Sequence, residues 1–259
     1  MGNIITKEIL NNSSNIIKQK KDIGFFNRVW ATDINVYLDR IKSIGMYNLE
    51  SVLDAGCGYG QWTYPLAQLN KKVLGIDVDK NRIEVVNQIV RQAYCENISL
   101  GVSDIENINY PKETFNGIFC YSALVFTDYK KTLQNFYNLL KPGGHFYFST
   151  NDIGWYLYNL SNDHNSTDDF STKEMAMSAI DNTIKYFTGD VYDRQKQIAM
   201  PKEHVKKLLF EIGFELIEIN GDGKIDINGE KKGVPFFEDS FNGFAMVYEV
   251  LCKRPLQRL

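Results

Sequence analysis

Short apolar runs alternate with helically periodic segments through the middle of the chain. The pattern predicts five strands, at Val52–Ala55, Lys72–Asp77, Ile98–Val102, Phe115–Tyr121 and His145–Thr150. It also predicts three helices between them, at Gln61–Leu69, Lys80–Tyr94 and Asp128–Leu140. Because parallel strands need long crossover connections, this alternation indicates a doubly wound α/β sheet with helices on both faces.

The sequence on either side extends this core. Ile34, Leu38, Ile41 and Ile44 share one face of a helix within an N-terminal helical segment, residues 1–48. Near the other end we expect a helix from Pro201 to Gly213, strands at Phe214–Asn220 and Gly243–Cys252, and a small hairpin at Asn228-Gly229. The whole, residues 1–259, is predicted to form a single Rossmann-like domain with a seven-stranded sheet.

The alternation stops after Thr150, and an insertion of about fifty residues (151–200) follows. Ser171 and Glu174 have the spacing of a capping box, and apolar residues recur at helical spacing behind them. Because the insertion leaves the fifth strand at its carboxyl end, where α/β sheets bind ligands, we expect a helical lid over the active site.

The most informative motif is Asp54-Ala55-Gly56-Cys57-Gly58-Tyr59-Gly60, directly after the first strand of the core. Residues without a Cβ allow the backbone to approach a ligand, and Gly56 and Gly58 are placed to do so. A dinucleotide fingerprint needs its third glycine where Gln61 stands. The charge of Asp54 repels a pyrophosphate but attracts an ammonium or sulfonium group, and S-adenosylmethionine carries both cations.

Together with three later motifs, this one resembles the class I S-adenosylmethionine-dependent methyltransferases over roughly residues 51–150. The later motifs are Gly75-Ile76-Asp77, Ser103-Asp104-Ile105 and Leu140-Lys141-Pro142-Gly143-Gly144. The resemblance implies that Asp77, with Val78 beside it, binds the cofactor ribose, and that Asp104 and Ile105 contact the adenine. It also implies that the last strand of the sheet is antiparallel.

Two further residues are assigned to the cofactor. Tyr121 ends the fourth strand, at the switch in strand order where ligands gather. In many relatives of this family the N-terminal segment folds over the cofactor, which assigns Trp30 to the donor or the acceptor, with plain core packing as the alternative.

Candidate catalytic residues come from the insertion. Asp152 and Tyr156 follow the fifth strand and would border the methyl group, and His164 lies in the proposed lid. The alternatives are capping for Asp152, packing for Tyr156 and a solvated loop position for His164. Trp155 and Arg194 are candidate substrate-binding residues. Arg194 either binds an anionic acceptor or forms a structural salt bridge to Asp190 or Asp193.

Composition and charge exclude several classes of binding partner. The formal net charge of −3 argues against nucleic acid, and no apolar run is long enough to span a membrane, so we expect a cytoplasmic protein. The segment from Asp222 to Asn228 lacks the carboxylates of a calcium loop, and we expect no metal. The oligomeric state is left open.

The aromatic-rich insertion favours a small-molecule acceptor, methylated on an oxygen or nitrogen atom. The layout resembles bacterial methyltransferases of natural-product and surface-polysaccharide pathways, which implies a sugar- or nucleotide-linked acceptor. Two alternatives remain open: a non-catalytic S-adenosylmethionine-binding module, and a nicotinamide-dependent dehydrogenase, which Gln61 and Asp54 oppose.

Overall fold

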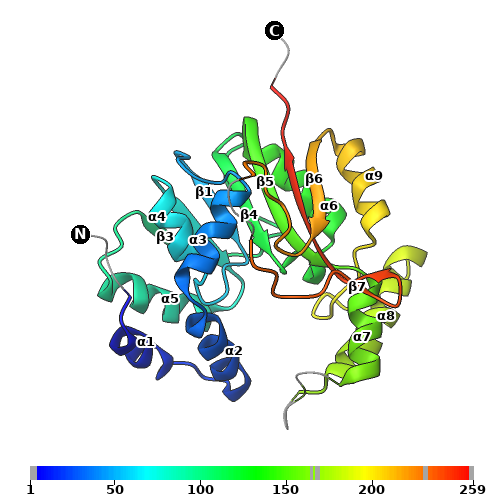
Figure 1. The fold of residues 1–259 in the computed structure, drawn as a ribbon, viewed down its shortest axis with the longest axis horizontal. Helices are drawn as coiled ribbons and strands as arrows, with labels where there is room; N and C mark the ends of the chain where they lie inside the picture. The colour runs from blue at the N-terminus through cyan, green and yellow to red at the C-terminus, as the bar shows by residue number, and fades with distance from the viewer. Residues whose placement is uncertain (1–4, 164–165, 167–169, 230–232, 257–259) are drawn as a thin grey trace.

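The computed structural model describes residues 5–163, 166, 170–229 and 233–256, and in these ranges a seven-stranded sheet forms the centre (Figure 1). Its strands are β1 (Val52–Ala55), β2 (Val73–Asp77), β3 (Ile98–Val102), β4 (Phe115–Tyr121), β5 (Leu140–Asn151), β6 (Glu215–Gly221) and β9 (Val247–Lys253). Their order is β3-β2-β1-β4-β5-β9-β6, and β9 is antiparallel to both of its neighbours. The predicted doubly wound sheet with an antiparallel last strand is confirmed.

Helices cover both faces of the sheet, and each face has its own hydrophobic core. Helices α3 (Ile34–Ser43) and α4 (Thr63–Leu69) pack on one face, against Phe119 and Tyr147 of the central strands. Helices α6 (Tyr129–Leu139) and α9 (Lys202–Ile212) pack on the other, against Ile118 and Phe146. Successive residues of a strand point to opposite faces, so neighbours in β4 and β5 belong to different cores.

The N-terminal helices α1 (Lys7–Ser14) and α2 (Lys20–Ala31) lie beside α5 (Lys80–Gln92), which covers β2 and β3 (Figure 1). Asn81 of α5 accepts a hydrogen bond from the backbone N–H of Lys18 at 3.1 Å and donates one to the carbonyl of Ile16 at 2.9 Å. Phe26 of α2 packs edge-on against Tyr59 of the glycine motif, with ring centroids 5.3 Å apart. These contacts fix the N-terminal segment to helix α5 and to the glycine motif after β1.

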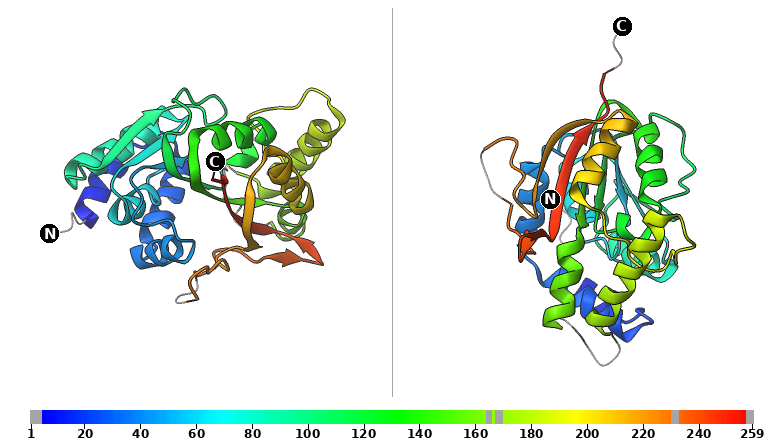
Figure 2. Two further views of the ribbon diagram at one scale, coloured as in Figure 1. Left: turned by 90° about the horizontal axis from the view of Figure 1, so that it is seen from above. Right: turned by 90° about the vertical axis from the view of Figure 1, so that its right-hand side faces the viewer.

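The insertion after β5 contains two helices, α7 (Ile153–Asn162) and α8 (Thr172–Thr188), which pack on each other at the carboxyl end of the strand (Figures 1 and 2). The Ser171 hydroxyl accepts a hydrogen bond from Glu174 N–H at 3.2 Å, as the capping box predicts. Residues 189–200 are not helical, and Met200 N–H bonds the carbonyl of Asn151 at 2.9 Å. None of the described helices is long and apolar enough to cross a membrane.

The hairpin before the last strand lies at a different Asn-Gly pair from the predicted one. Asn228-Gly229 lies in a turn with no strand directly before it among the described residues, and the residues that follow it, 230–232, lie outside the described ranges. The neighbouring Ile227 N–H bonds the carbonyl of Ser43 on α3. The hairpin is instead made by β7 (Ser240–Phe241) and β8 (Phe244–Ala245). Between them Asn242 and Gly243 have φ of 48° and 84°, the positive values that a tight hairpin turn requires.

Candidate active site

The glycine motif forms the turn between β1 and α4, and its three glycines differ in how closely other residues pack on them. A Cβ on Gly56 would lie 2.4 Å from the Cβ of Ala123, and one on Gly60 would lie 2.8 Å from Val86, so both glycines permit close packing. At Gly58, whose φ is +55°, a Cβ would meet nothing nearer than the side chain of Gln61 at 3.6 Å. Gly58 is itself buried, and the added Cβ would also meet Phe25 at 3.9 Å, so this position is less crowded than the other two but not empty.

Asp54 is a buried carboxyl group beside this turn, only 1% exposed. Thr63 donates a hydrogen bond to its Oδ2 at 2.6 Å. Burial raises the pKa of Asp54 to about 7, against the effect of the Thr63 hydrogen bond, and the nearby Asp77 adds to the rise. A cation placed here would restore the charged form, so the site suits the ammonium or sulfonium of S-adenosylmethionine.

Asp77, at the end of β2, holds the glycine turn in place. Its Oδ2 accepts a hydrogen bond from Gly58 N–H at 2.9 Å, and its Oδ1 accepts one from Asp79 N–H at 2.9 Å. Each carboxylate oxygen retains a second lone pair for a ribose hydroxyl. Val78 follows with 73% of its side chain exposed, which leaves an apolar surface next to the carboxylate.

The third acidic residue lies on the loop after β3. Asp104 is exposed and accepts hydrogen bonds from Glu106 N–H at 2.8 Å and from the Asn107 amide at 2.7 Å, while Ile105 is buried. Ser103 N–H bonds the carbonyl of Asp77 at 3.0 Å. The predicted ribose and adenine segments are therefore directly joined.

Gln61 is a residue of this site that the sequence alone did not assign. Within the described part of the chain, its buried side-chain oxygen Oε1 has no hydrogen-bond partner. The same side chain lies next to Gly58. A buried acceptor without a donor is costly, and a hydroxyl or ammonium of the cofactor would satisfy it. The residues present therefore fit S-adenosylmethionine.

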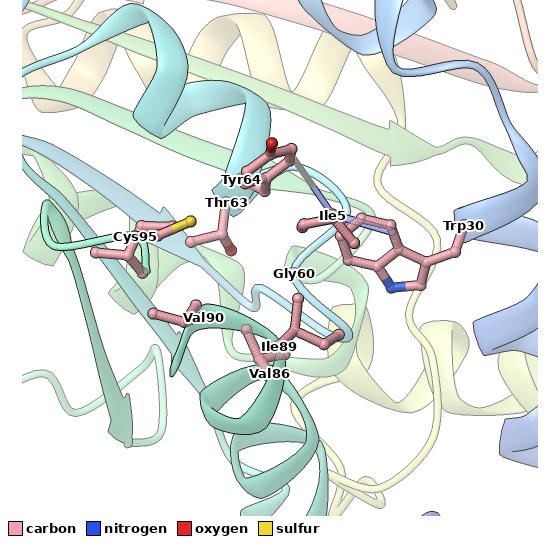
Figure 3. A pocket seen from close by; sticks show the side chains of 10 residues that line it. Ile5, Trp30, Gly60, Thr63, Tyr64, Val86, Ile89, Val90 and Cys95 are labelled. Atoms are coloured by element: carbon pink, nitrogen blue, oxygen red, sulfur yellow. The ribbon is translucent and has the colours of Figure 1, made fainter. Parts of the chain in front are cut away.

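The side chain of Trp30 contacts the backbone of the glycine turn. The indole Nε1 donates to the carbonyl of Tyr59 at 3.2 Å. Its ring borders a cavity of about 10 Å³ at the junction of α4 and α5, which Ile5, Thr63 and Tyr64 also line (Figure 3). This cavity holds about one water molecule and is too small for a cofactor. The assignment of Trp30 to the cofactor remains a prediction.

The candidate catalytic residues of the insertion make structural contacts. Asp152 caps α7 by accepting from Ile153 N–H at 2.6 Å, and its other oxygen accepts from Lys202 N–H at 2.8 Å. Burial raises the pKa of Asp152, and these backbone donors oppose the rise. Tyr156 is fully buried, and its hydroxyl contacts Gln197 at 3.1 Å. Their catalytic roles remain predictions, and His164 lies outside the described residues.

Arg194 has a partner on another part of the chain. Its Nη1 lies 2.9 Å from Oε1 of Glu106, next to the adenine segment, rather than on Asp190 or Asp193. Glu106 is buried and also accepts from the Lys131 ammonium at 3.2 Å and from Asp128 N–H at 3.0 Å. The Arg194 side chain is 58% exposed. Substrate binding by Arg194 remains a prediction.

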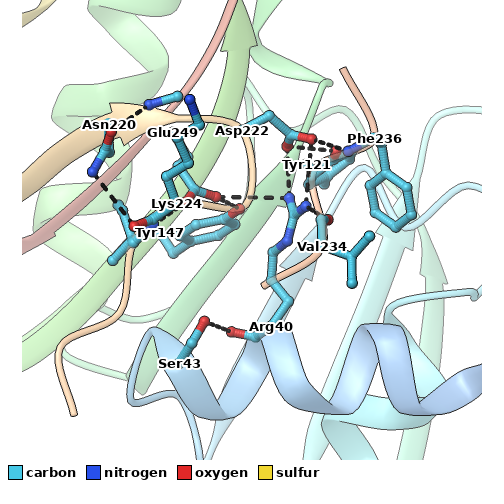
Figure 4. Close-up of polar contacts among 12 residues, drawn as sticks. Arg40, Ser43, Tyr121, Tyr147, Asn220, Asp222, Lys224, Val234, Phe236 and Glu249 are labelled. Atoms are coloured by element: carbon cyan, nitrogen blue, oxygen red, sulfur yellow. Dashed lines mark hydrogen bonds and ion pairs between the residues drawn. The ribbon is translucent and has the colours of Figure 1, made fainter. Parts of the chain in front are cut away.

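A buried ionic network adjoins Tyr121, whose assignment to the cofactor remains a prediction (Figure 4). The network itself was not predicted from the sequence. Arg40 of α3 pairs with Asp222 at 2.6 Å and lies 3.7 Å from Glu249 of β9. Tyr121 donates to Asp222 at 3.0 Å, and Tyr147 donates to Glu249 at 2.6 Å. The available signal was an arginine adjoining the apolar face of a predicted helix, since a buried charge needs a partner.

The fold and the glycine turn with its acidic residues define the class of S-adenosylmethionine-dependent methyltransferases. A family model described as a methyltransferase domain matches residues 48–211, more than half of the chain, and the chain belongs to this family. Among solved structures, an S-adenosylmethionine-dependent methyltransferase from Clostridium acetobutylicum has a similar fold. It gives a TM-score of 0.59 at 20% identity and covers 86% of this chain and 93% of that one.

Curated relatives match over shorter stretches. The demethylmenaquinone methyltransferase of Geobacillus sp. is 30% identical over 110 residues, which are 41% of this chain and 47% of that protein. The ubiquinone biosynthesis O-methyltransferase of Coxiella burnetii is 33% identical over 112 residues, 42% and 47% of the two chains. The tRNA N(3)-methylcytidine methyltransferase of Schizosaccharomyces pombe is 33% identical over 134 residues, 46% and 42%. Each match therefore spans less than half of the relative.

Proposed function

We propose that this protein transfers the methyl group of S-adenosylmethionine to an oxygen or nitrogen atom of a small-molecule acceptor. The observation that carries the proposal is the paired environment of Asp54 and Asp77. One carboxyl group is buried without a cation, and the other is fixed to the turn at Gly58. This arrangement supports binding of a ligand that has both a positive charge and a ribose.

The roles of the chain's residues follow from this placement. Asp54 attracts the cationic part of the donor. Asp77 and Gln61 accept hydrogen bonds from its hydroxyl or ammonium groups, and Ile105 covers one side of its adenine ring. S-adenosylmethionine supplies a methyl carbon already activated by the sulfonium. The protein then has to hold the acceptor atom in line, about 3 Å away, and to exclude water.

The surroundings of Asp152 and Tyr156 bear on the acceptor. Asp152 caps α7 and also accepts from Lys202 N–H, and the Tyr156 hydroxyl bonds Gln197 in the interior, so both side chains have structural contacts and we assign no base. A neutral amine needs no base, and an acidic hydroxyl such as a phenol loses its proton readily. This favours an amine or an acidic hydroxyl over a simple alcohol.

Two sources suggest the kind of small molecule. The layout of the sequence favours a sugar- or nucleotide-linked intermediate of surface-polysaccharide or natural-product biosynthesis. The names of the Geobacillus and Coxiella relatives point to quinone precursors. All of these acceptors contain a ring, and we propose a ring-bearing acceptor as the common feature. The relative that acts on tRNA is a weaker guide, because a net charge of −3 disfavours binding to phosphates.

A turnover assay tests the proposal. Conversion of S-adenosylmethionine to S-adenosylhomocysteine is measured with catechols and hydroquinones, nucleotide sugars, aromatic amines and bulk tRNA as separate acceptors, and Asp77→Ala serves as the matched inactive control. Turnover with one small-molecule group, absent in the control, supports the proposal. Turnover with tRNA alone contradicts the small-molecule assignment. Donor binding without turnover across the panel indicates a non-catalytic module, and binding of NAD in its place indicates a dehydrogenase.

A further inference from the structure

A row of aromatic side chains follows the carboxyl edge of the sheet from β4 to the insertion. We call it the aromatic wall, and its residues are Tyr121, Phe236, Phe237, Trp155, Tyr158 and Phe241. Ring centroids are 6.4 Å apart for Tyr121 and Phe236, 5.2 Å for Phe237 and Trp155, 6.3 Å for Trp155 and Tyr158, and 5.5 Å for Tyr158 and Phe241.

The wall begins beside the cofactor turn. Trp62, the second residue after Gly60, lies 4.9 Å from the ring of Tyr121. Two residues beyond Tyr121, Ala123 packs against Gly56. At its other end the wall reaches α7, at the carboxyl end of β5. Phe236 is 36% exposed, so part of this aromatic surface faces outward.

One buried carboxylate fixes the start of the wall. Asp222 is fully buried, and its Oδ1 accepts from the hydroxyl of Tyr121 at 3.0 Å. Its Oδ2 accepts from two successive backbone N–H groups, those of Phe236 at 2.6 Å and Phe237 at 3.2 Å (Figure 4). The position of three aromatic residues therefore depends on this one side chain.

Arg40 holds the carboxylate in turn. Its two terminal nitrogens lie 2.6 Å and 3.3 Å from the oxygens of Asp222, and its guanidinium carbon lies 4.9 Å from the ring centre of Phe236. It also donates to the carbonyl of Val234 on the same loop. A buried ion pair is often no more stabilising than apolar residues of the same shape, so fixing a local geometry accounts better for this pair than stability does.

Resting on the proposed function, we propose that the aromatic wall binds a flat ring of the acceptor and that Asp222 is the residue that positions it. Stacking on aromatic faces suits a flat ring, because offset-stacked and edge-to-face arrangements are both favourable. Asp222 does not touch the acceptor. It acts by orienting the hydroxyl of Tyr121 and the backbone of Phe236 and Phe237.

The experiment uses 1,4-naphthoquinone as a flat-ring probe and follows quenching of tryptophan fluorescence in the full chain. We compare Asp222→Asn with Glu249→Gln, a matched control in the same buried network. Glu249 bonds Tyr147 and Ile225 N–H but touches no residue of the wall in the contacts described. Trp155→Phe keeps an aromatic ring in the wall and reports whether the quenching arises there.

We expect Asp222→Asn to weaken probe binding about tenfold, and Glu249→Gln to change probe affinity less than about twofold. Both variants should melt at a lower temperature than the natural chain. Equal weakening in both folded variants would show that Asp222 acts only through stability, and unchanged binding in folded Asp222→Asn would overturn its positioning role. Absence of probe binding by the natural chain would overturn the wall itself.

Two milder variants keep the test decisive if Asp222→Asn does not fold. Phe237→Ala removes one ring of the wall, and Tyr121→Phe removes only the hydroxyl that Asp222 accepts from. Each should weaken the probe, Phe237→Ala more strongly, and no effect from either would contradict the proposal. Donor binding and methyl transfer are measured separately, so failure of the proposed function is seen without the probe.

Discussion

The two halves of the carboxyl edge are built in different ways. The cofactor half lies within about fifty consecutive residues, and its key contacts join carboxylates or carbonyls to backbone N–H groups, as between Asp77 and Gly58. The acceptor half is assembled from distant segments. Tyr121 and Asp222 are 101 positions apart in the chain, and Arg40 and Asp222 are 182 apart. The first half is a motif, and the second is a product of tertiary packing.

Two buried carboxyl groups show what this difference means for ligands. Asp222 has a guanidinium and several donors within the protein, so its charge is already compensated. Asp54 has one hydroxyl donor and a pKa raised to about 7 by burial. A charge that the protein leaves uncompensated is available to a ligand. This contrast supports the proposal that the donor cation binds beside Asp54, whereas the charge of Asp222 serves contacts within the protein.

The largest effect is expected at the cofactor half. Asp77→Ala removes the acceptor of two ribose hydrogen bonds, worth about 1.5–3 kcal/mol each, and frees Gly58. Affinity for S-adenosylhomocysteine measured by calorimetry should fall at least about 100-fold. Asp79→Ala is the control, because Asp79 caps α5 and its loss should lower stability by about 1 kcal/mol with affinity preserved. Unchanged affinity in Asp77→Ala would show that the ribose assignment is wrong.

In the acceptor half, a substitution in the buried ionic network should lower the stability of the protein. Arg40→Met leaves Asp222 buried without its cation, and we expect the free energy of unfolding to fall by about 3–5 kcal/mol in urea denaturation. Arg82→Met is the matched control. Its pair with Asp22, at 3.3 Å, is partly exposed, and the loss should stay near 1 kcal/mol or below. A similar loss in both variants would mean that the buried network has no special role.

The contrast between the halves also explains what the sequence revealed. The alternation of strands and helices, the glycine turn and the acidic residues at the ends of β1 and β2 and after β3 followed from local pattern, because each depends on a few neighbouring residues. The Arg40–Asp222 pair did not, because nothing near Asp222 in the sequence indicates a partner on α3. The acidic segment that contains Asp222 does not match a calcium loop, and its sequence predicts no function.

The misplaced hairpin has the same cause. Asn228-Gly229 and Asn242-Gly243 carry the same local signal, and among the described residues strands flank the second pair but none directly precedes the first. Near the first, Ile225 N–H bonds Glu249 and Ile227 N–H bonds the carbonyl of Ser43. Backbone groups that are already bonded to β9 and α3 cannot pair with each other. Long-range contacts, which the sequence does not display, decided between two equal turns.

The pH dependence of protein stability would sharpen the contrast between Asp54 and Asp222. With a folded pKa of about 7 against an ordinary 3.8, folded Asp54 keeps a proton that the unfolded chain has released between about pH 4 and 7. Stability should therefore fall as pH rises through this window, by on the order of 2–4 kcal/mol, and level off above it.

Asp54→Asn is the control for this dependence. It removes the contribution of Asp54 and leaves that of other carboxyl groups in place, so the difference between the two urea series isolates this residue. Cofactor binding near pH 6 should also release up to about one proton, because the donor cation lowers the pKa of Asp54. Identical pH profiles for the two proteins would show that Asp54 is already charged in the free protein.

The smallest effect is expected from Arg194→Ala, which asks whether this residue belongs to the acceptor site or to the scaffold around it. Its guanidinium pairs with Glu106, but the Arg194 side chain is 58% exposed, and Glu106 keeps Lys131 and Asp128 N–H as donors. An exposed pair contributes about 0–1 kcal/mol, so the melting temperature should drop slightly with the acceptor KM unchanged. Lys196→Ala, in the same segment but 3.9 Å from Asp193, should behave like the natural chain. A tenfold rise in KM without a change in melting temperature, about 1.4 kcal/mol of binding, would instead place Arg194 on an anionic acceptor and extend the acceptor half as far as the adenine segment.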